Sequence, residues 1–158
     1  GRVAEHWYNL QPLVTQTASG RSMTDGPTAV VDLDKTAENK AVVEGFIADV
    51  LQGGAPDKIT DYVSITTYYQ PNPAIDDGLA SLGEALATMA EAGQPIAYAE
   101  THMVVAEGNF VFAASEGTIG ETPTAFFDLF RVDDGLIVEH WDTVSSIPEE
   151  MPHENGKF

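Results

Sequence analysis

The stretch that most constrains the fold of this chain is residues 126–142, where two apolar runs flank Asp133-Asp134-Gly135. The runs are rich in aromatic and β-branched side chains, which favour strands, and Asp-Gly supplies the positive φ angles of a tight turn. The sequence therefore predicts a β-hairpin here. Burial among aromatic side chains raises the pKa of a carboxyl group, so ionisable residues inside such strands are candidates for a functional site. The hairpin contains three of them: Asp128, His140 and Asp142.

The periodicity of the remaining chain predicts helices first and strands afterwards. Apolar residues at helical spacing indicate a helix around 42–51 that begins at Asp34 or Thr36. Ser81 and Glu84 match a capping box for a later helix. This order predicts an α+β domain with N-terminal helices packed on one face of a curved antiparallel sheet. The other expected elements are helices at about 56–63 and 79–92 and strands at about 96–106, 110–118, 124–133 and 136–146.

The first residues repeat part of the hairpin. Glu5-His6-Trp7 copies Glu139-His140-Trp141, and Gly1 stands where Gly135 stands. Internal similarity of this kind is seldom accidental. We therefore predict that residues 1–33 are an N-terminal strand and arm, the remnant of a preceding unit of the same fold, and that residues 34–158 form the domain. The alternative is an arm that packs its tryptophan.

Composition excludes several classes of function. The chain has 158 residues, 25 acidic and 7 basic, and a formal net charge of −18. Such a surface repels phosphate backbones and anionic lipids, which excludes nucleic acid and membranes as partners. With no cysteine, thiolate metal sites and cysteine nucleophiles are excluded as well. No apolar run approaches the roughly 18 residues of a membrane span, and we expect a cytoplasmic protein.

The amino-acid sequence of the hairpin resembles that of the SnoaL-like proteins of the NTF2-like (cystatin-like α+β) superfamily. Residues 126–142, the following Ile147-Pro148 and the closing residues 155–158 carry the resemblance, and residues 68–73 and 106–109 are similar to two further motifs of that family. The resemblance covers roughly Asp34 to the end. It implies a conical half-barrel with a pocket between sheet and helices, and polyketide-cyclase or isomerase relatives that act on apolar carbonyl compounds without a metal or organic cofactor.

Strand alternation groups the candidate site residues by face. Asp128 shares a face with two phenylalanines and is the expected general acid/base, unless it is only a structural partner of Arg131 or of a histidine. His140 and Asp142 share a face, and His102 is expected close by. The predicted catalytic set is thus Asp128, His140, Asp142 and His102. The predicted substrate contacts are Tyr68, Gln70, Asn72, Glu116, Phe126, Phe130 and Trp141.

Departures from the family pattern leave alternatives open. Relatives usually have a histidine where this chain has Pro71, and many have one where Ala114 stands. The chain is therefore expected to be an isomerase, cyclase or aldol-type enzyme, or else a non-catalytic ligand-binding or dimerisation module; epoxide hydrolysis is a third candidate. A homodimer is expected. A metal is not, because the pair His140 and Asp142 would need His102 or His153 as a third ligand.

Overall fold

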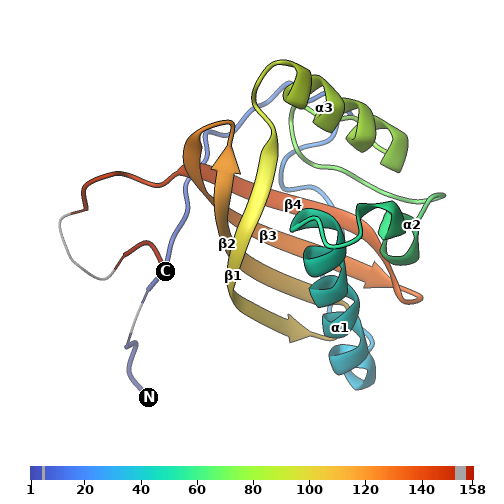
Figure 1. Cartoon of the computed structure of the whole chain (residues 1–158). Helices are drawn as coiled ribbons and strands as arrows, with labels where there is room; N and C mark the ends of the chain where they lie inside the picture. Colours follow the sequence, from blue (N-terminus) through green and yellow to red (C-terminus); the bar gives the residue numbers. More distant parts are fainter. Residues whose placement is uncertain (5, 152–155) are drawn as a thin grey trace.

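The computed structural model describes residues 1–4, 6–151 and 156–158, and its helices pack against one face of a single curved sheet (Figure 1). The α+β architecture predicted from the sequence is confirmed. In chain order the helical elements are the 3₁₀ turn η1 (Leu33–Lys35), helix α1 (Thr36–Phe46), the π-helical turn η2 (Ile47–Leu51), the 3₁₀ turn η3 (Pro56–Lys58), helix α2 (Ile59–Tyr62) and helix α3 (Leu79–Glu91).

The sheet has four strands in the order in which they occur in the chain, each antiparallel to the next. Asp134 and Gly135, with φ angles of 47° and 78°, form the predicted turn between the last two strands. Those strands pair along nearly their whole length, and Asp128 faces Asp142 across them. The strand bounds are β1 Ile96–Glu107, β2 Phe110–Ile119, β3 Thr122–Asp133 and β4 Leu136–Ser146.

The core lies between α1 and the inner face of the sheet. Phe46 from the end of the helix packs edge-on against Phe130 of β3, with ring centroids 5.8 Å apart. Full burial of such side chains contributes about 1.5–3 kcal/mol each, so this contact fixes the helix on the sheet. The buried side chains of the core are Val43, Phe46, Ile47, Val63, Tyr68, Val111, Ala113, Phe130, Val132 and Ile137.

Two helix starts differ from the sequence prediction. Lys35, and neither Asp34 nor Thr36, is the N-cap of α1, because the preceding 3₁₀ turn leads directly into the helix. The N-cap of α3 is Gly78, and no side chain caps this helix. The hydroxyl of Ser81 instead donates to the carbonyl oxygen of Asp77 at 3.0 Å. The predicted capping box is therefore wrong.

The N-terminal arm is held by side-chain contacts to the sheet. Residues 1–4 and 6–32 form no strand, so the prediction of a strand is wrong for the residues described here. The amide of Asn9 donates to the carbonyl oxygen of Ala125 at 3.1 Å, and Oε1 of Gln11 accepts from the amide of Val144 at 3.0 Å. These contacts lie near the start of β3 and the end of β4. The preceding unit stays a prediction, and Glu5 of the repeat lies outside the described residues.

Strand β1 changes the face of its side chains along its length. Its pairing with β2 shifts between Tyr98 and Glu100, and again between Thr101 and Met103. Gly117 of β2 lies against this irregular stretch, where a Cβ atom would collide with the carbonyl oxygen of Ala97. A bulge inserts an extra residue and so reverses the alternation beyond it. Tyr98 therefore lies on the inner face, whereas Glu100 and His102 do not follow the predicted alternation. Beyond the second shift Val104 packs against the core again.

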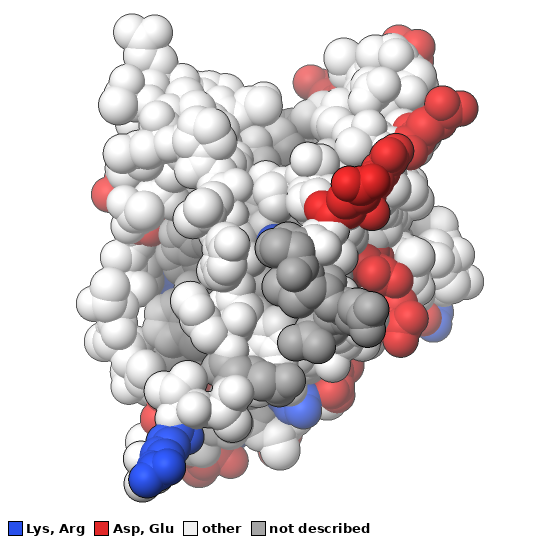
Figure 2. Space-filling model, turned by 90° about the vertical axis from the view of Figure 1, so that its left-hand side faces the viewer, with Lys and Arg blue, Asp and Glu red and all other residues white. Residues whose placement is uncertain are grey.

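Acidic side chains outnumber basic ones on the molecular face shown in Figure 2. This distribution agrees with the formal net charge of −18 for the whole chain. Within the described part of the chain, we find no helix with the length and apolar character that crossing a membrane requires.

Candidate active site

A cavity of about 490 Å³ lies between the helices and the inner face of the sheet. Its volume is within the range of about 300–1,000 Å³ that is typical of small-molecule sites. Apolar side chains from several elements form most of the wall, among them Leu82, Leu86, Met89, Ile96 and Phe126. Polar side chains from β1, β4 and the loop before α3 also line it: Tyr68, Gln70, Asn72, Tyr98, His140 and Asp142.

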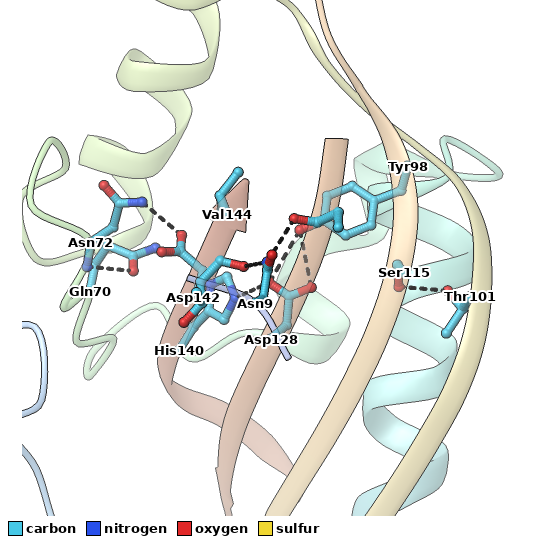
Figure 3. A network of polar contacts seen from close by, with 12 residues as sticks. Asn9, Gln70, Asn72, Tyr98, Thr101, Ser115, Asp128, His140, Asp142 and Val144 are labelled. Atoms are coloured by element: carbon cyan, nitrogen blue, oxygen red, sulfur yellow. Dashed lines mark hydrogen bonds and ion pairs between the residues drawn. The ribbon is translucent and has the colours of Figure 1, made fainter. Parts of the chain in front are cut away.

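The central polar contact joins the two strands of the predicted hairpin (Figure 3). Nε2 of His140 on β4 lies 2.9 Å from Oδ1 of Asp128 on β3. The hydroxyl of Tyr98 donates to the same carboxylate, at 3.3 Å from Oδ1 and 3.2 Å from Oδ2. Asp128 is only 1% exposed and is not among the residues that line the cavity. It contacts the cavity through His140 and Tyr98.

The surroundings of the His140 ring fix its orientation and raise its pKa. It stacks on Phe130, with ring centroids 4.5 Å apart and an interplanar angle of 9°. Burial lowers the pKa of His140, but the hydrogen bond and the negative charge of Asp128, with a smaller effect of Asp142, raise it above the usual value of 6.5 overall. Since Nε2 is bound by Asp128, the other ring nitrogen, Nδ1, is the one available to a ligand.

Asp142 lies beside this pair on β4. Its Oδ2 atom accepts a hydrogen bond of 2.7 Å from the side-chain amide of Asn72. Burial raises the pKa of Asp142, the charge of His140 and the bond from Asn72 lower it, and the net shift is upward. Its Oδ1 atom is enclosed and has no hydrogen-bond partner among the described residues.

The loop that carries Asn72 is joined to β4 by backbone contacts. Tyr69 pairs with Glu139 in a short parallel bridge, and its carbonyl oxygen accepts from the amide of His140 at 3.2 Å. The side chain of Gln70 is buried and donates to the hydroxyl oxygen of Tyr68 at 3.3 Å. Burial raises the pKa of Tyr68, with smaller effects of the carboxylates, so this hydroxyl stays protonated near neutral pH.

The structure thus brings most of the sequence-predicted residues together. Asp128, His140, Asp142, Tyr68, Gln70 and Asn72 form one polar group around the cavity, and Phe126 belongs to its wall. Phe130 is fully buried behind His140 and supports the ring. Tyr98 and Gln11 are among the residues of the cavity wall that the sequence analysis did not predict. A bulge and an arm position them, and neither feature has a sequence signal that places a side chain.

Three predicted residues lie elsewhere, and their assignment to the pocket is wrong. His102 and Glu116 lie on the outer side of the sheet, where Nε2 of His102 is 3.5 Å from Oε2 of Glu116. The His102 ring stacks on Phe158, with ring centroids 4.3 Å apart. The first bulge in β1 accounts for this, because it reverses the alternation between Tyr98 and His102. Trp141 alternates with the inward His140 and Asp142, and its Nε1 donates to the carbonyl oxygen of Asp25 at 2.7 Å.

One group of side chains could offer ligand atoms to a metal ion. Glu100, His102 and Glu116 have such atoms within 4.8 Å of one another, and two of these residues are exposed. They lie outside the cavity. His153, the other histidine considered as a metal ligand, is not among the described residues. The expected homodimer stays a prediction.

The fold and the site define the class of protein: an NTF2-like α+β domain with a polar group of side chains inside its half-barrel. A family model for the SnoaL-like domain matches residues 43–140, which is more than half of the chain. The chain belongs to the SnoaL-like family. The search of curated proteins finds no match.

Solved structures of similar fold support the same class. A cystatin-like protein of unknown function from Xanthomonas campestris is 24% identical, with a TM-score of 0.56 over 68% of this chain and 90% of its own. A protein provisionally assigned as a ketosteroid isomerase, from Kribbella flavida, is 17% identical, with a TM-score of 0.57 over 77% and 87%. An LEH-like epoxide hydrolase of M. tuberculosis is 24% identical, with a TM-score of 0.50 over 70% and 85%. At these identities the likeness shows the fold.

Proposed function

We propose that this SnoaL-like domain is an enzyme that moves protons on apolar carbonyl compounds in the cavity, without a metal or organic cofactor. The observation that carries the proposal is the bond between His140 and the enclosed Asp128 in the cavity wall. A histidine with a carboxylate at one ring nitrogen has a fixed tautomer, and its other nitrogen is then a general base. The assignment of a ketosteroid isomerase of the same fold agrees with this chemistry.

In this mechanism neutral His140 removes a proton from the carbon next to the carbonyl group. Asp128 stabilises the imidazolium that forms, at a distance of 2.9 Å. The hydroxyl of Tyr68 lines the cavity and accepts from Gln70, so its hydrogen is available to the carbonyl oxygen, which becomes an enolate oxygen. In a substrate with a conjugated double bond, the enolate takes the proton back from His140 at a more distant carbon, as in an isomerase. Alternatively it attacks a second carbonyl, whose oxygen then takes the proton from His140, as in a cyclase or aldol-type enzyme.

A second candidate is epoxide hydrolysis. The specific observation in its favour is the pair of carboxylates, Asp128 and Asp142, on directly facing positions of β3 and β4. One carboxylate would activate a water molecule while the site protonates the epoxide oxygen. The fold is shared with an LEH-like epoxide hydrolase. This chemistry is recognised by its product, because it gives a diol and needs no α-proton.

The test is hydrogen exchange at carbon in D₂O. We expect the protein to speed deuterium incorporation next to the carbonyl of bicyclic ketones such as decalone by at least about 10²-fold, the lower end for acid–base catalysis. Mass spectrometry measures the incorporation, with heat-unfolded protein as the control. If ketones of a size that fits the cavity bind but exchange no faster than in buffer, the enzyme proposal fails and the non-catalytic binding module is the better account. Conversion of an epoxide to a diol in the same screen would establish the second candidate.

A further inference from the structure

One buried atom of the site has no partner in the fold. Oδ1 of Asp142 is the one buried side-chain nitrogen or oxygen atom, among the residues that the structure describes, that makes no hydrogen bond. The other oxygen of the same carboxylate is bound by Asn72 at 2.7 Å, so the side chain is held in place. A buried polar atom left without a partner destabilises the protein, and the effect is larger for a charged group. Such an atom in a folded protein calls for an explanation.

The position of this atom points to a ligand. Asp142 belongs to the cavity wall, next to His140, and Figure 3 shows it between Asn72 and the Asp128–His140 pair. Three nearby donors bind other oxygen atoms, because Asn72 binds Oδ2 and both Tyr98 and His140 bind Asp128. The rest of the wall is mostly apolar, and its other donors, among them Gln11, Tyr68 and Thr88, make no hydrogen bond to this atom. A group that satisfies this carboxylate oxygen therefore comes from the contents of the cavity.

We propose that the substrate carries, besides its carbonyl group, a hydrogen-bond donor that binds Oδ1 of Asp142. The substrate class is thus a carbonyl compound with a hydroxyl or a protonated amino group on an apolar skeleton. This inference rests on the proposed function, because the same cavity holds the reacting carbonyl. Asp142 is then a specificity-determining residue: it selects the ligand and sets its orientation relative to Nδ1 of His140.

The experiment compares ligands that differ only in the donor. The probes are decalone, a set of hydroxydecalones with the hydroxyl at different ring carbons, and the matching aminodecalones, with binding measured by calorimetry. The best donor-bearing compound should bind the wild-type protein at least about tenfold more tightly than decalone, since a hydrogen bond to a charged group has this effect or more. Comparison of the hydroxyl and amino series identifies which donor the site prefers.

The matched variant is Asp142→Asn, which replaces the acceptor oxygen with an amide of the same shape. In this variant the preference for the donor should disappear, so that decalone and the donor-bearing compounds bind with affinities within about threefold of each other. Asp133→Asn, at the exposed end of β3, is the control and should keep the preference.

Two results would overturn the inference, and they differ in what they say of the proposed function. Equal affinity of decalone and all donor-bearing compounds, in wild type and Asp142→Asn alike, shows that Asp142 recognises no ligand donor; exchange on decalone would then leave the proposed function standing. If no compound binds and none exchanges, both proposals fail.

Discussion

Replacement of His140 by glutamine is expected to lower the rate of α-proton exchange by about 10²–10⁴-fold, the range for loss of a general acid–base group. Glutamine can still donate to Asp128 through its amide, so the buried carboxylate keeps a partner and the protein stays folded. It cannot accept and return a proton near neutral pH. The measurement is the initial rate of deuterium incorporation at saturating ketone, with circular dichroism to verify the fold.

The same substitution at His102 is the matched control. His102 lies on the outer side of the sheet against Phe158, so His102→Gln should leave the exchange rate within about twofold of wild type. If His140→Gln exchanges as fast as the wild type, His140 moves no proton. If both variants lose the same part of the rate, the loss is structural, and this result contradicts the assignment as well.

The second large effect is expected on stability and concerns Arg131. Nε of Arg131 on β3 lies 2.9 Å from Oε2 of Glu139 on β4, and the side chain of Glu139 is only 2% exposed. Burial raises the pKa of Glu139, although the hydrogen bond and charge of Arg131 oppose this shift. Arg131→Met would leave a buried carboxylate without its main cation. We expect the free energy of unfolding to fall by about 3 kcal/mol at pH 7.

Two controls distinguish the loss of this ion pair from the effect of removing any arginine side chain. Arg2→Met, on the exposed arm, should change the unfolding free energy by less than about 0.5 kcal/mol. Glu139→Gln in the Arg131→Met background should recover part of the loss, because it removes the unpaired charge. Denaturation in urea measures all four proteins. Without recovery in the double variant, the ion pair is not what stabilises these strands.

The pH dependence of Arg131→Met follows from the sign of the shift. A carboxyl whose pKa is raised on folding contributes stability that is present below its unfolded value and lost as pH rises through the folded value. Removing Arg131 raises the folded pKa of Glu139 further, since the arginine lowers it. The difference in stability between variant and wild type should therefore shrink as the pH falls from 7 toward 5.

The fold was predictable from local signals in the sequence. Asp134 and Gly135 adopt the positive φ angles that the turn required, and the period-two pattern located all four strands to within about two residues. Alternation along β3 and β4 placed Asp128, His140 and Asp142 on one face, because these strands pair regularly in that region. The site therefore follows from sequence wherever the ladder is regular.

Irregular pairing explains what the sequence could not show. The bulges in β1 arise from its pairing with β2, so no local sequence pattern predicts that Tyr98 faces inward and His102 outward. For a similar reason, the sequence did not predict which of the two residues, Asp128 or His140, faces the cavity. Alternation places both residues on the inner face, but only the packed structure shows that His140 belongs to the cavity wall and Asp128 lies behind it.

The central claim is that Asp128 and His140 form one acid–base unit, and an NMR titration tests it most directly. The ring signals of His140, assigned by their loss in His140→Gln, should titrate above the usual pKa of 6.5 in the wild-type protein. In Asp128→Asn the negative charge is removed and the hydrogen bond is weakened, so the pKa of His140 should move clearly downward. If His140 titrates at the same pH in both proteins, Asp128 does not control its charge, and the account of the site is contradicted.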